Sequence, residues 1–223
     1  MSFAVNRVLR SVYIFEVAKT AQEDTSRFWL SSNPNDPFYV WLKQNQVPFQ
    51  PGKIPTFADG GSGRAYFLGN KVVKFTRNRV EANVAKAAIG QDAPTAAISI
   101  WRAPGGEPLW AILQKYVNVN VEEELKDAAD IASTVLDDLR EKNTNFTHFN
   151  TKQMQKLAID ACNKYSKPMT LVPYIVSAMN AINQLYFRTG FTHDDLDPSN
   201  IARDFDTGNI VFHDLGPNMT KAF

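Results

Sequence analysis

Two neighbouring stretches near the end of the chain decide the fold. They read Gly190-Phe-Thr-His193-Asp-Asp195-Leu-Asp197-Pro-Ser-Asn200-Ile and Asn209-Ile-Val-Phe-His-Asp214-Leu-Gly216. Asp195 and Asn200 lie five positions apart on a loop that contains a proline, and Asp214 follows a short apolar run. Carboxylate and amide oxygens are ligands that Mg²⁺ accepts. Loops rich in Asp, Pro, Ser and Asn are also common as ordinary turns, so the rest of the chain must decide between these interpretations.

The composition is that of an ordinary globular protein. The chain has 223 residues, of which 44% are hydrophobic and 21% charged, and its formal net charge is +1. A balanced charge gives no electrostatic reason to expect a nucleic-acid or membrane partner. Cys162 is the only cysteine, which excludes an intrachain disulfide and favours a reducing compartment. The apolar residues after Arg7 and Arg10 are interrupted by charges and do not form a signal-peptide core, so we expect a cytoplasmic protein.

Residues 1–52 are predicted to be an N-terminal helical extension. Apolar residues recur at helical spacing over 3–20, and Asp36 followed by Pro37 is typical of a helix start, here of a helix through Lys43. No chemical motif occurs in this region. We expect its aromatic residues to make apolar contacts with the domain behind it: Phe28, Trp29, Phe38, Tyr39 and Trp41.

Residues 53–117 have the pattern of an antiparallel sheet with one inserted helix. Strands are predicted at 54–58, 65–68, 71–75, 97–101 and 109–117, and a helix at 77–88. A glycine-rich turn, Asp59-Gly-Gly61-Ser-Gly63-Arg, separates the first two strands, and Gly69-Asn70 is typical of a tight hairpin. The last two strands are apolar enough to be central in the sheet.

Residues 118–223 are predicted to be mainly helical, ahead of the acidic loop. Helices are expected from about 120 to 141, from 150 to 165 and from 171 to 189, with Gly190 as the stop of the last one. The third helix is apolar on more than one face, so it should be enclosed by other elements. We expect residues 3–45 or a second subunit to cover it.

The order of these features resembles the protein-kinase-like superfamily, in particular compact bacterial and phage kinase-like proteins and the aminoglycoside-phosphotransferase branch. The resemblance spans residues 54 to about 217 and depends on the pattern H-x-D-x-x-x-x-N followed by D-L-G. It implies an α+β, minimal two-lobed fold: a small antiparallel sheet lobe and a reduced helical lobe. It also implies ATP and Mg²⁺ as cofactors. Only seven residues follow Gly216, so the peptide-binding subdomain of such kinases is expected to be missing.

The resemblance assigns the nucleotide to residues of the sheet lobe. Gly61-Ser62-Gly63 would bring backbone N–H groups to the phosphates, and Lys74 would pair with the α- and β-phosphates while Glu81 holds it. Gln114 and Tyr116 would lie in the segment that receives adenine. The simpler interpretations are a glycine-rich hairpin turn and an ordinary surface lysine on an edge strand. Glu81 follows Lys74 by only seven residues, which is close for that pairing.

The acidic loop would supply the chemistry. Asp195 would orient the acceptor's hydroxyl, Asn200 and Asp214 would bind Mg²⁺, and His193 would brace the loop. The sequence departs from the family at Asp197, where a lysine or histidine usually helps to neutralise the transferring phosphate. Three functions follow as alternatives: a phosphotransferase acting on a protein, a pseudokinase-like module that binds nucleotide or a partner without transfer, and a nucleotidyl transferase. A homo-oligomer is compatible with each.

Overall fold

The structure is a computed structural model that describes residues 25–60, 63–142, 144, 148–193, 200–215 and 219–221. It is a mixed α+β protein, as expected. Two compact units are distinguished. The first contains the described residues up to Ala82 together with Ile98–Tyr116, and the second contains Asn83–Ala97 and the described residues from Val117. The helix predicted at 3–20 lies outside the described residues.

The first unit is built on a five-stranded sheet. Its strands are β1 (Phe57–Gly60), β2 (Gly63–Leu68), β3 (Lys71–Thr76), β4 (Ala97–Arg102) and β5 (Trp110–Lys115), in the order β1-β2-β3-β5-β4. The predicted hairpin at Gly69-Asn70 joins β2 to β3. The order makes β3 the middle strand and β4 an edge strand. The expectation that residues 97–101 form a central strand was therefore wrong: β5 pairs with β3, and β4 lies outside it.

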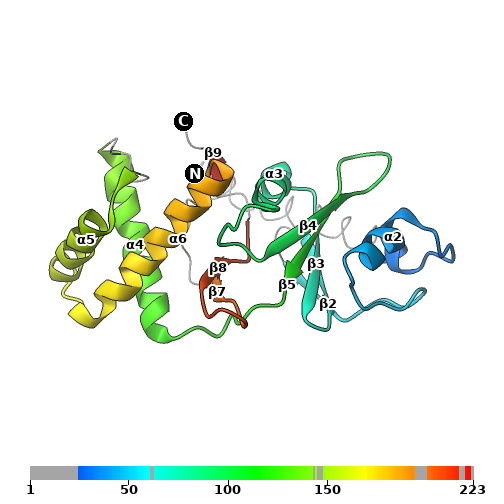
Figure 1. Cartoon of the computed structure of the whole chain (residues 1–223), viewed down its shortest axis with the longest axis horizontal. Helices are drawn as coiled ribbons and strands as arrows, with labels where there is room; N and C mark the ends of the chain where they lie inside the picture. Colours follow the sequence, from blue (N-terminus) through cyan, green and yellow to red (C-terminus); the bar gives the residue numbers. More distant parts are fainter. Residues whose placement is uncertain are drawn as a thin grey trace, which may run out of the picture. The chain divides into compact units, whose positions relative to one another are not determined.

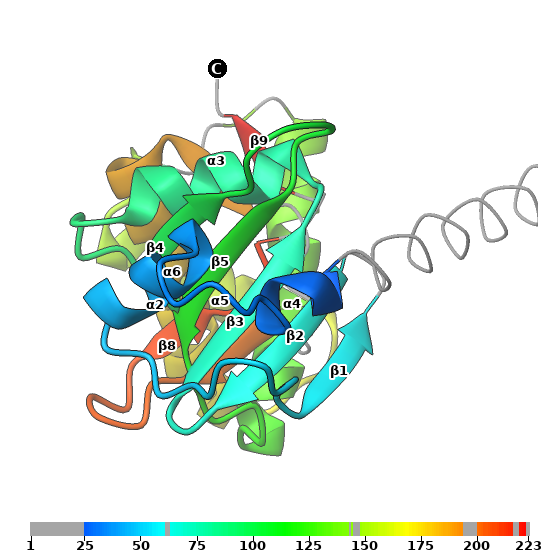
Figure 2. The ribbon, with the colours of Figure 1, turned by 90° about the vertical axis from the view of Figure 1, so that its right-hand side faces the viewer.

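One face of this sheet is covered by the N-terminal segment. The helix α2 (Pro37–Gln44) begins at Asp36, whose Oδ1 accepts a hydrogen bond from the Phe38 N–H at 2.9 Å, as the Asp-Pro pair predicted. Figure 2 looks onto the face of the sheet in front of which α2 lies. The covering residues and the strand residues beneath them form one core, which includes Trp29, Phe38, Tyr39, Leu42, Tyr66, Val73, Phe75 and Leu113.

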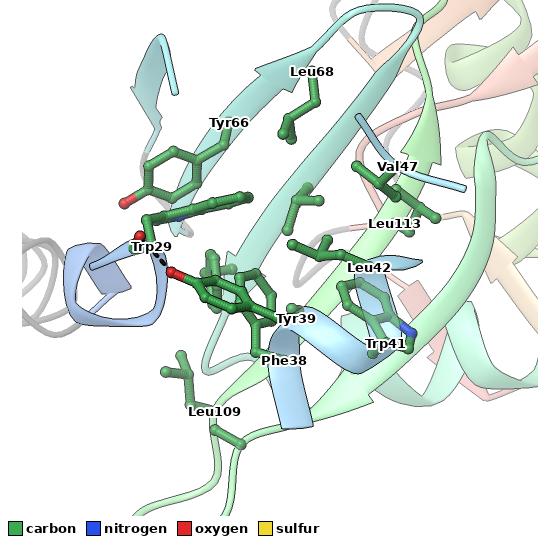
Figure 3. Close-up of a cluster of buried hydrophobic side chains, with 14 residues drawn as sticks. Trp29, Phe38, Tyr39, Trp41, Leu42, Val47, Tyr66, Leu68, Leu109 and Leu113 are labelled. Carbon is green, nitrogen blue, oxygen red and sulfur yellow. Dashed lines mark hydrogen bonds between the residues drawn. The ribbon is translucent and has the colours of Figure 1, made fainter. Parts of the chain in front are cut away.

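This core is dominated by aromatic rings (Figure 3). The Trp29 and Phe38 rings meet edge to face at 5.0 Å between centroids, and the Tyr39 hydroxyl donates to the Trp29 carbonyl oxygen at 2.6 Å. Large buried aromatic side chains contribute much of the apolar area that stabilises a small domain. We expected residues 3–45 or a second subunit to cover the helical lobe. The described part of that segment instead packs on the sheet, because its aromatic side chains fit the row Tyr66, Val73, Phe75.

Helices form most of the second unit. They are the part of α3 (Arg79–Ala88) from Asn83 on, α4 (Glu123–Glu141), α5 (Thr151–Lys164) and α6 (Val172–Thr189), the last preceded by a 3₁₀ turn at Met169–Leu171. Helix α6 contacts both α4 and α5, and the three helices lie together in Figure 1. The predicted enclosure of α6 holds along one side, where Ile175, Met179, Ile182 and Leu185 are buried in this packing, whereas Phe187 is 62% exposed.

Short polar signals set the ends of these helices. Asn150 and Gln153 form a reciprocal capping box at the start of α5, with N–H···O distances of 3.0 and 2.8 Å. Gly190 ends α6 in the left-handed conformation, with φ of 73°. The start of α5 and the end of α6 lie where the sequence predicted them.

Two small hairpins complete the second unit. Strand β6 (Phe191–His193) pairs with β9 (Met219–Lys221), and β7 (Ile201–Arg203) pairs with β8 (Ile210–Phe212). Two further backbone segments join the second hairpin. Thr95 forms a parallel bridge with Phe212, and Asn118 an antiparallel bridge with Arg203. The hairpin is thus bound on both sides. Among the described residues, no helix is both long and apolar enough to cross a membrane.

Candidate functional site

Lys74 lies in the middle of the main sheet. It pairs in register with Ala65 on β2 and with Ile112 on β5, and its side chain is only 12% exposed. A lysine on a central strand with that exposure is not the surface lysine of an edge strand. Its neighbours in sequence, Val73 and Phe75, are buried in the aromatic core, so Lys74 projects from the opposite face.

Glu81 is held against Lys74 by the short connection between β3 and α3 (Arg79–Ala88). Asn78 begins this helix: its Oδ1 accepts from the Val80 N–H at 2.9 Å, while its own N–H donates to Thr76 Oγ1 at 3.0 Å. Because Asn78 fixes the first turn, Glu81 faces back toward β3, and its Oε1 lies 2.6 Å from Lys74 Nζ. A separation of seven residues is therefore sufficient for the expected ion pair.

The Glu81 carboxylate is wholly buried, with 0% exposure. Apart from the ion pair with Lys74, neither of its oxygens receives a hydrogen bond from the described residues. A buried charge with a single partner is costly to maintain, and removing that partner is more costly still. The packing of the sheet and helix α3 therefore gives no reason by itself for an ion pair at this position.

The glycine-rich turn lies at one end of the same sheet. Strands β1 and β2 pair up to Gly60 opposite Gly63, and Gly61 and Ser62, the two predicted phosphate-binding residues between them, lie outside the described part. Gly63 itself must be glycine. A Cβ atom there would lie 1.9 Å from the Phe75 carbonyl oxygen, and its φ is +155°. The close approach of β3 therefore explains Gly63 without reference to a ligand, whereas Gly61 keeps only its sequence-based role.

Sequence reasoning missed a cluster beside this turn. Asp59 and Arg64 are register partners across β1 and β2, and Arg64 Nε donates to Asp59 Oδ1 at 2.7 Å. Burial opposes the charge on Arg64, but its hydrogen bonds to Asp59 and Tyr66 raise its pKa above the ordinary value. The signal in the sequence was the placement of Asp and Arg at equal distances from a two-residue turn, which makes them cross-strand neighbours.

The predicted adenine-binding segment lies at the end of β5. Gln114 is buried, at 5% exposure, and pairs in register with Val72. The Tyr116 side chain is half-exposed, and its backbone N–H donates to the Asn70 carbonyl oxygen at 2.9 Å. That N–H is engaged in the fold, so recognition of adenine through it would require this bond to break.

Asn200 and Asp214 lie at the same end of the β7–β8 hairpin. Ile201 pairs with Phe212, and one step further the His213 N–H donates to the Asn200 carbonyl oxygen at 3.2 Å. Asp214 follows directly. Both predicted Mg²⁺ ligands are half-buried and come from adjacent strand ends. The hairpin pairing thus places Asn200 and Asp214 at the same end of the hairpin, although they lie fourteen positions apart in the sequence.

The far end of this hairpin is stabilised by polar contacts. The Asp204 Oδ1 accepts from the N–H groups of Asp206 and Thr207, at 2.9 and 3.0 Å, and closes the turn. Arg203 Nε lies 2.9 and 3.1 Å from the two carboxylate oxygens of Glu122, and hydrogen bonding to Arg203 lowers the Glu122 pKa below its ordinary value. These contacts fix the strands that present Asn200 and Asp214.

Asp195, the predicted catalytic residue, and Asp197 lie outside the described residues. The backbone of His193 belongs to β6, so the acidic loop starts directly from a paired strand. Among the described residues, no group of three His, Cys, Asp or Glu side chains is close enough to bind a metal. Asn200 with Asp214 is a donor set that fits Mg²⁺ only with phosphate oxygens and water completing the shell, the arrangement Mg²⁺ usually adopts with nucleotides.

Comparison with known proteins adds no family to this description. No protein-family model matches the chain, and no curated protein matches it.

Proposed function

We propose that this protein is a Mg²⁺- and ATP-dependent phosphotransferase of the kinase-like type, acting on a protein acceptor in the cytoplasm. The observation that carries the proposal is the Lys74–Glu81 ion pair, at 2.6 Å, on the central strand of a sheet whose hairpin ends in a glycine turn. Stability alone gives little reason to bury a carboxylate and a lysine together, since apolar residues of similar volume serve as well or better. A requirement for an oriented cation explains the pair.

In this proposal Lys74 binds phosphate oxygens and Glu81 fixes the position of its ammonium group. Lysine is a strong partner for phosphate when its flexible side chain is restrained. The backbone of the glycine turn, at Gly61 and Ser62, contributes N–H groups to the same phosphates. Mg²⁺·ATP supplies the transferable phosphoryl group, and the chain binds and orients it.

The second unit supplies the acceptor side and the metal ligands. Asn200 and Asp214 offer one amide and one carboxylate oxygen from adjacent strand ends. Asp195 accepts or orients the proton of the acceptor hydroxyl. The acceptor hydroxyl belongs to another protein or to a second copy of this chain.

A second function, nucleotide or partner binding without transfer, is favoured by Asp197. A carboxylate two positions after Asp195 adds negative charge where a transferring phosphate needs neutralisation. The hydrogen bond from the Tyr116 N–H to Asn70 also favours this second function, because that N–H is then not available to bind adenine. In this alternative Lys74, held by Glu81, binds nucleotide, and the bound nucleotide only makes the protein more rigid.

One experiment separates these functions. The purified full-length protein is incubated with Mg²⁺ and ATP labelled at either the γ- or the α-phosphate. Transfer of γ label to the protein or to a model protein acceptor supports the phosphotransferase. Transfer of α label indicates nucleotidyl transfer, and saturable ATP binding without transfer of either label indicates the binding module. Absence of ATP binding would reject both transferases and the nucleotide-binding form of the module.

A further inference from the structure

Two aromatic side chains lie on the face of the sheet that carries Lys74. The register partner of Phe67 on β3 is Val72, two positions before Lys74. Successive side chains of a strand point to opposite faces, so Val72 and Phe67 share the Lys74 face. Tyr116 continues the same alternation from Ile112, the partner of Lys74 on β5. The two rings and the ammonium group therefore belong to one face of the first unit.

The two rings contact each other and remain accessible. Their centroids lie 6.2 Å apart, and the rings meet edge to face at 81°. Phe67 is 37% exposed although β2 is an interior strand, and Tyr116 is 48% exposed. On the opposite face of β2 and β3, Tyr66 and Phe75 are almost wholly buried under the N-terminal segment. Packing among the described residues thus covers the aromatic side chains of one face and leaves this pair open on the other.

The surroundings of the pair fit a flat ring joined to phosphates. Val72 and Lys74 lie two residues apart, which is about 7 Å along a strand. A ribose creates a similar separation between a base and its first phosphate. The Tyr116 N–H donates to the Asn70 carbonyl oxygen, so the ring faces, rather than this backbone group, are what the segment presents to a base. Gln114, the register partner of Val72, is 5% exposed and has little surface to offer to the edge of a base.

We propose that Phe67 and Tyr116 form a platform on which the base of the nucleotide stacks, and that the site therefore accepts purine nucleoside triphosphates with little discrimination between adenine and guanine. This inference rests on the proposed function, in which Lys74 binds the phosphates. Stacking uses the π-face that every base has, so it adds affinity without reading the hydrogen-bonding edge in which the two purines differ.

The test uses the full chain and three ligands in the presence of Mg²⁺: ATP, GTP and inorganic triphosphate, which has the phosphates but no base. Phe67→Leu and Tyr116→Leu keep apolar bulk but remove a ring face, whereas Tyr116→Phe removes only the hydroxyl. Phe57→Leu is the matched control. Phe57 is 43% exposed on the neighbouring strand β1 and lies on the opposite face, as the register partner of the buried Tyr66. Dissociation constants are measured well below the unfolding temperature of each variant.

We expect the parent to bind ATP and GTP within a few-fold of each other, and both more tightly than inorganic triphosphate. Phe67→Leu and Tyr116→Leu should each weaken both nucleotides roughly tenfold, a usual effect of removing one stacking ring, and should leave the affinity for inorganic triphosphate unchanged. Tyr116→Phe and Phe57→Leu should bind all three ligands as the parent does. An aromatic pair that serves only stability would change the unfolding temperature and none of the affinities.

Other outcomes would overturn the inference. If both leucine variants bind ATP as the parent does, or if the parent binds inorganic triphosphate as tightly as ATP, the platform is rejected while the proposed function stands. A preference for ATP over GTP of more than about tenfold would show that the base is recognised at its edge instead. A parent that binds neither nucleotide rejects the proposed function and this inference with it. Should Phe67→Leu fail to fold, Tyr116→Leu, at the more exposed position, decides by the same criteria.

Discussion

Lys74 Nζ lies 2.6 Å from Glu81 Oε1, although the two residues belong to different elements and only residues 77 and 78 join β3 to α3. The short connection restricts the orientation of α3 relative to β3, and the Asn78 cap fixes the first turn of the helix. The ion pair is therefore built into the fold of the sheet unit. Each partner depends on the other, because Glu81 is wholly buried and Lys74 nearly so.

This dependence gives the first prediction. On sequence grounds, Lys74→Ala should spare thermal stability; the buried Glu81 reverses that expectation, since breaking a buried pair from one side costs about 3–5 kcal/mol. We expect Lys74→Met to lower the unfolding temperature and to weaken ATP binding tenfold or more. The double variant Lys74→Met/Glu81→Gln should recover part of the stability but none of the binding. Calorimetry and ATP titration check both. Recovery of binding in the double variant would show that Lys74 is structural only.

Gly63 gives the second prediction. Gly63→Ala would place a Cβ atom 1.9 Å from the Phe75 carbonyl oxygen, so β2 and β3 must separate locally. The free energy of unfolding should fall by more than about 3 kcal/mol, the range of severe backbone and packing defects. Gly105→Ala is the control: its φ of 76° is also strained for alanine, but nothing lies within 4 Å. Urea denaturation compares them, and equal losses would contradict the close approach.

The Glu122–Arg203 contact predicts a pH dependence. Hydrogen bonding to Arg203 lowers the Glu122 pKa, so the folded state favours the ionised carboxylate more than the unfolded state does. The stabilisation is therefore fully present above the ordinary pKa of glutamate, about 4.3, and is lost as pH falls through the lower folded pKa. Glu122→Gln should be less stable than the parent at pH 7, and the difference should shrink below about pH 4.

Glu124→Gln is the control for that pH series. Glu124 is an exposed glutamate in the first turn of α4, two positions after Glu122. Its substitution should change the unfolding temperature little at any pH, as for most surface positions. A pH-independent loss in Glu122→Gln would mean that the carboxylate charge does not contribute.

Asp214 predicts a metal-specific effect. If Asp214 binds Mg²⁺, Asp214→Asn removes the one charged ligand of the pair formed with Asn200, and ATP binding should lose its dependence on Mg²⁺ concentration. Asp206→Asn, in the exposed turn of the same hairpin, should leave that dependence unchanged. Titrations with ATP across a Mg²⁺ series are the measurement. Identical Mg²⁺ dependence in Asp214→Asn and the parent would remove Asp214 from the site.

Asp195 separates transfer from binding. If it orients the acceptor hydroxyl, Asp195→Asn should reduce transfer by about 10²–10⁴-fold, the usual contribution of a general base, while ATP affinity stays within a few-fold. Transfer of γ label and ATP titration are measured on the same preparations. Asp197→Lys is the companion variant: it should raise the rate, because it replaces repulsion of the transferring phosphate with attraction. Undiminished transfer in Asp195→Asn would reject the catalytic role.

The sequence by itself determined the features that are set by a few neighbouring residues. The Asp36-Pro37 helix start, the Gly69-Asn70 turn, the Asn150/Gln153 capping box and the Gly190 stop were all predicted, since each depends on side chains or dihedral angles within one turn of backbone. The pairing of Lys74 with Glu81 was also predicted, from the resemblance to kinase-like proteins.

Only the tertiary structure decided which surfaces are buried together. Apolar content suggested a central position for residues 97–101, but strand order depends on pairing between distant segments, and β5 takes that place. The aromatic residues near Trp29 predict an apolar surface but not the element that packs against it. In the structure that element is the sheet. The contact of Arg64 with Ser26 joins residues 38 positions apart. Burial is a long-range property, because the hydrophobic effect has no direction and local sequence therefore cannot specify its partner.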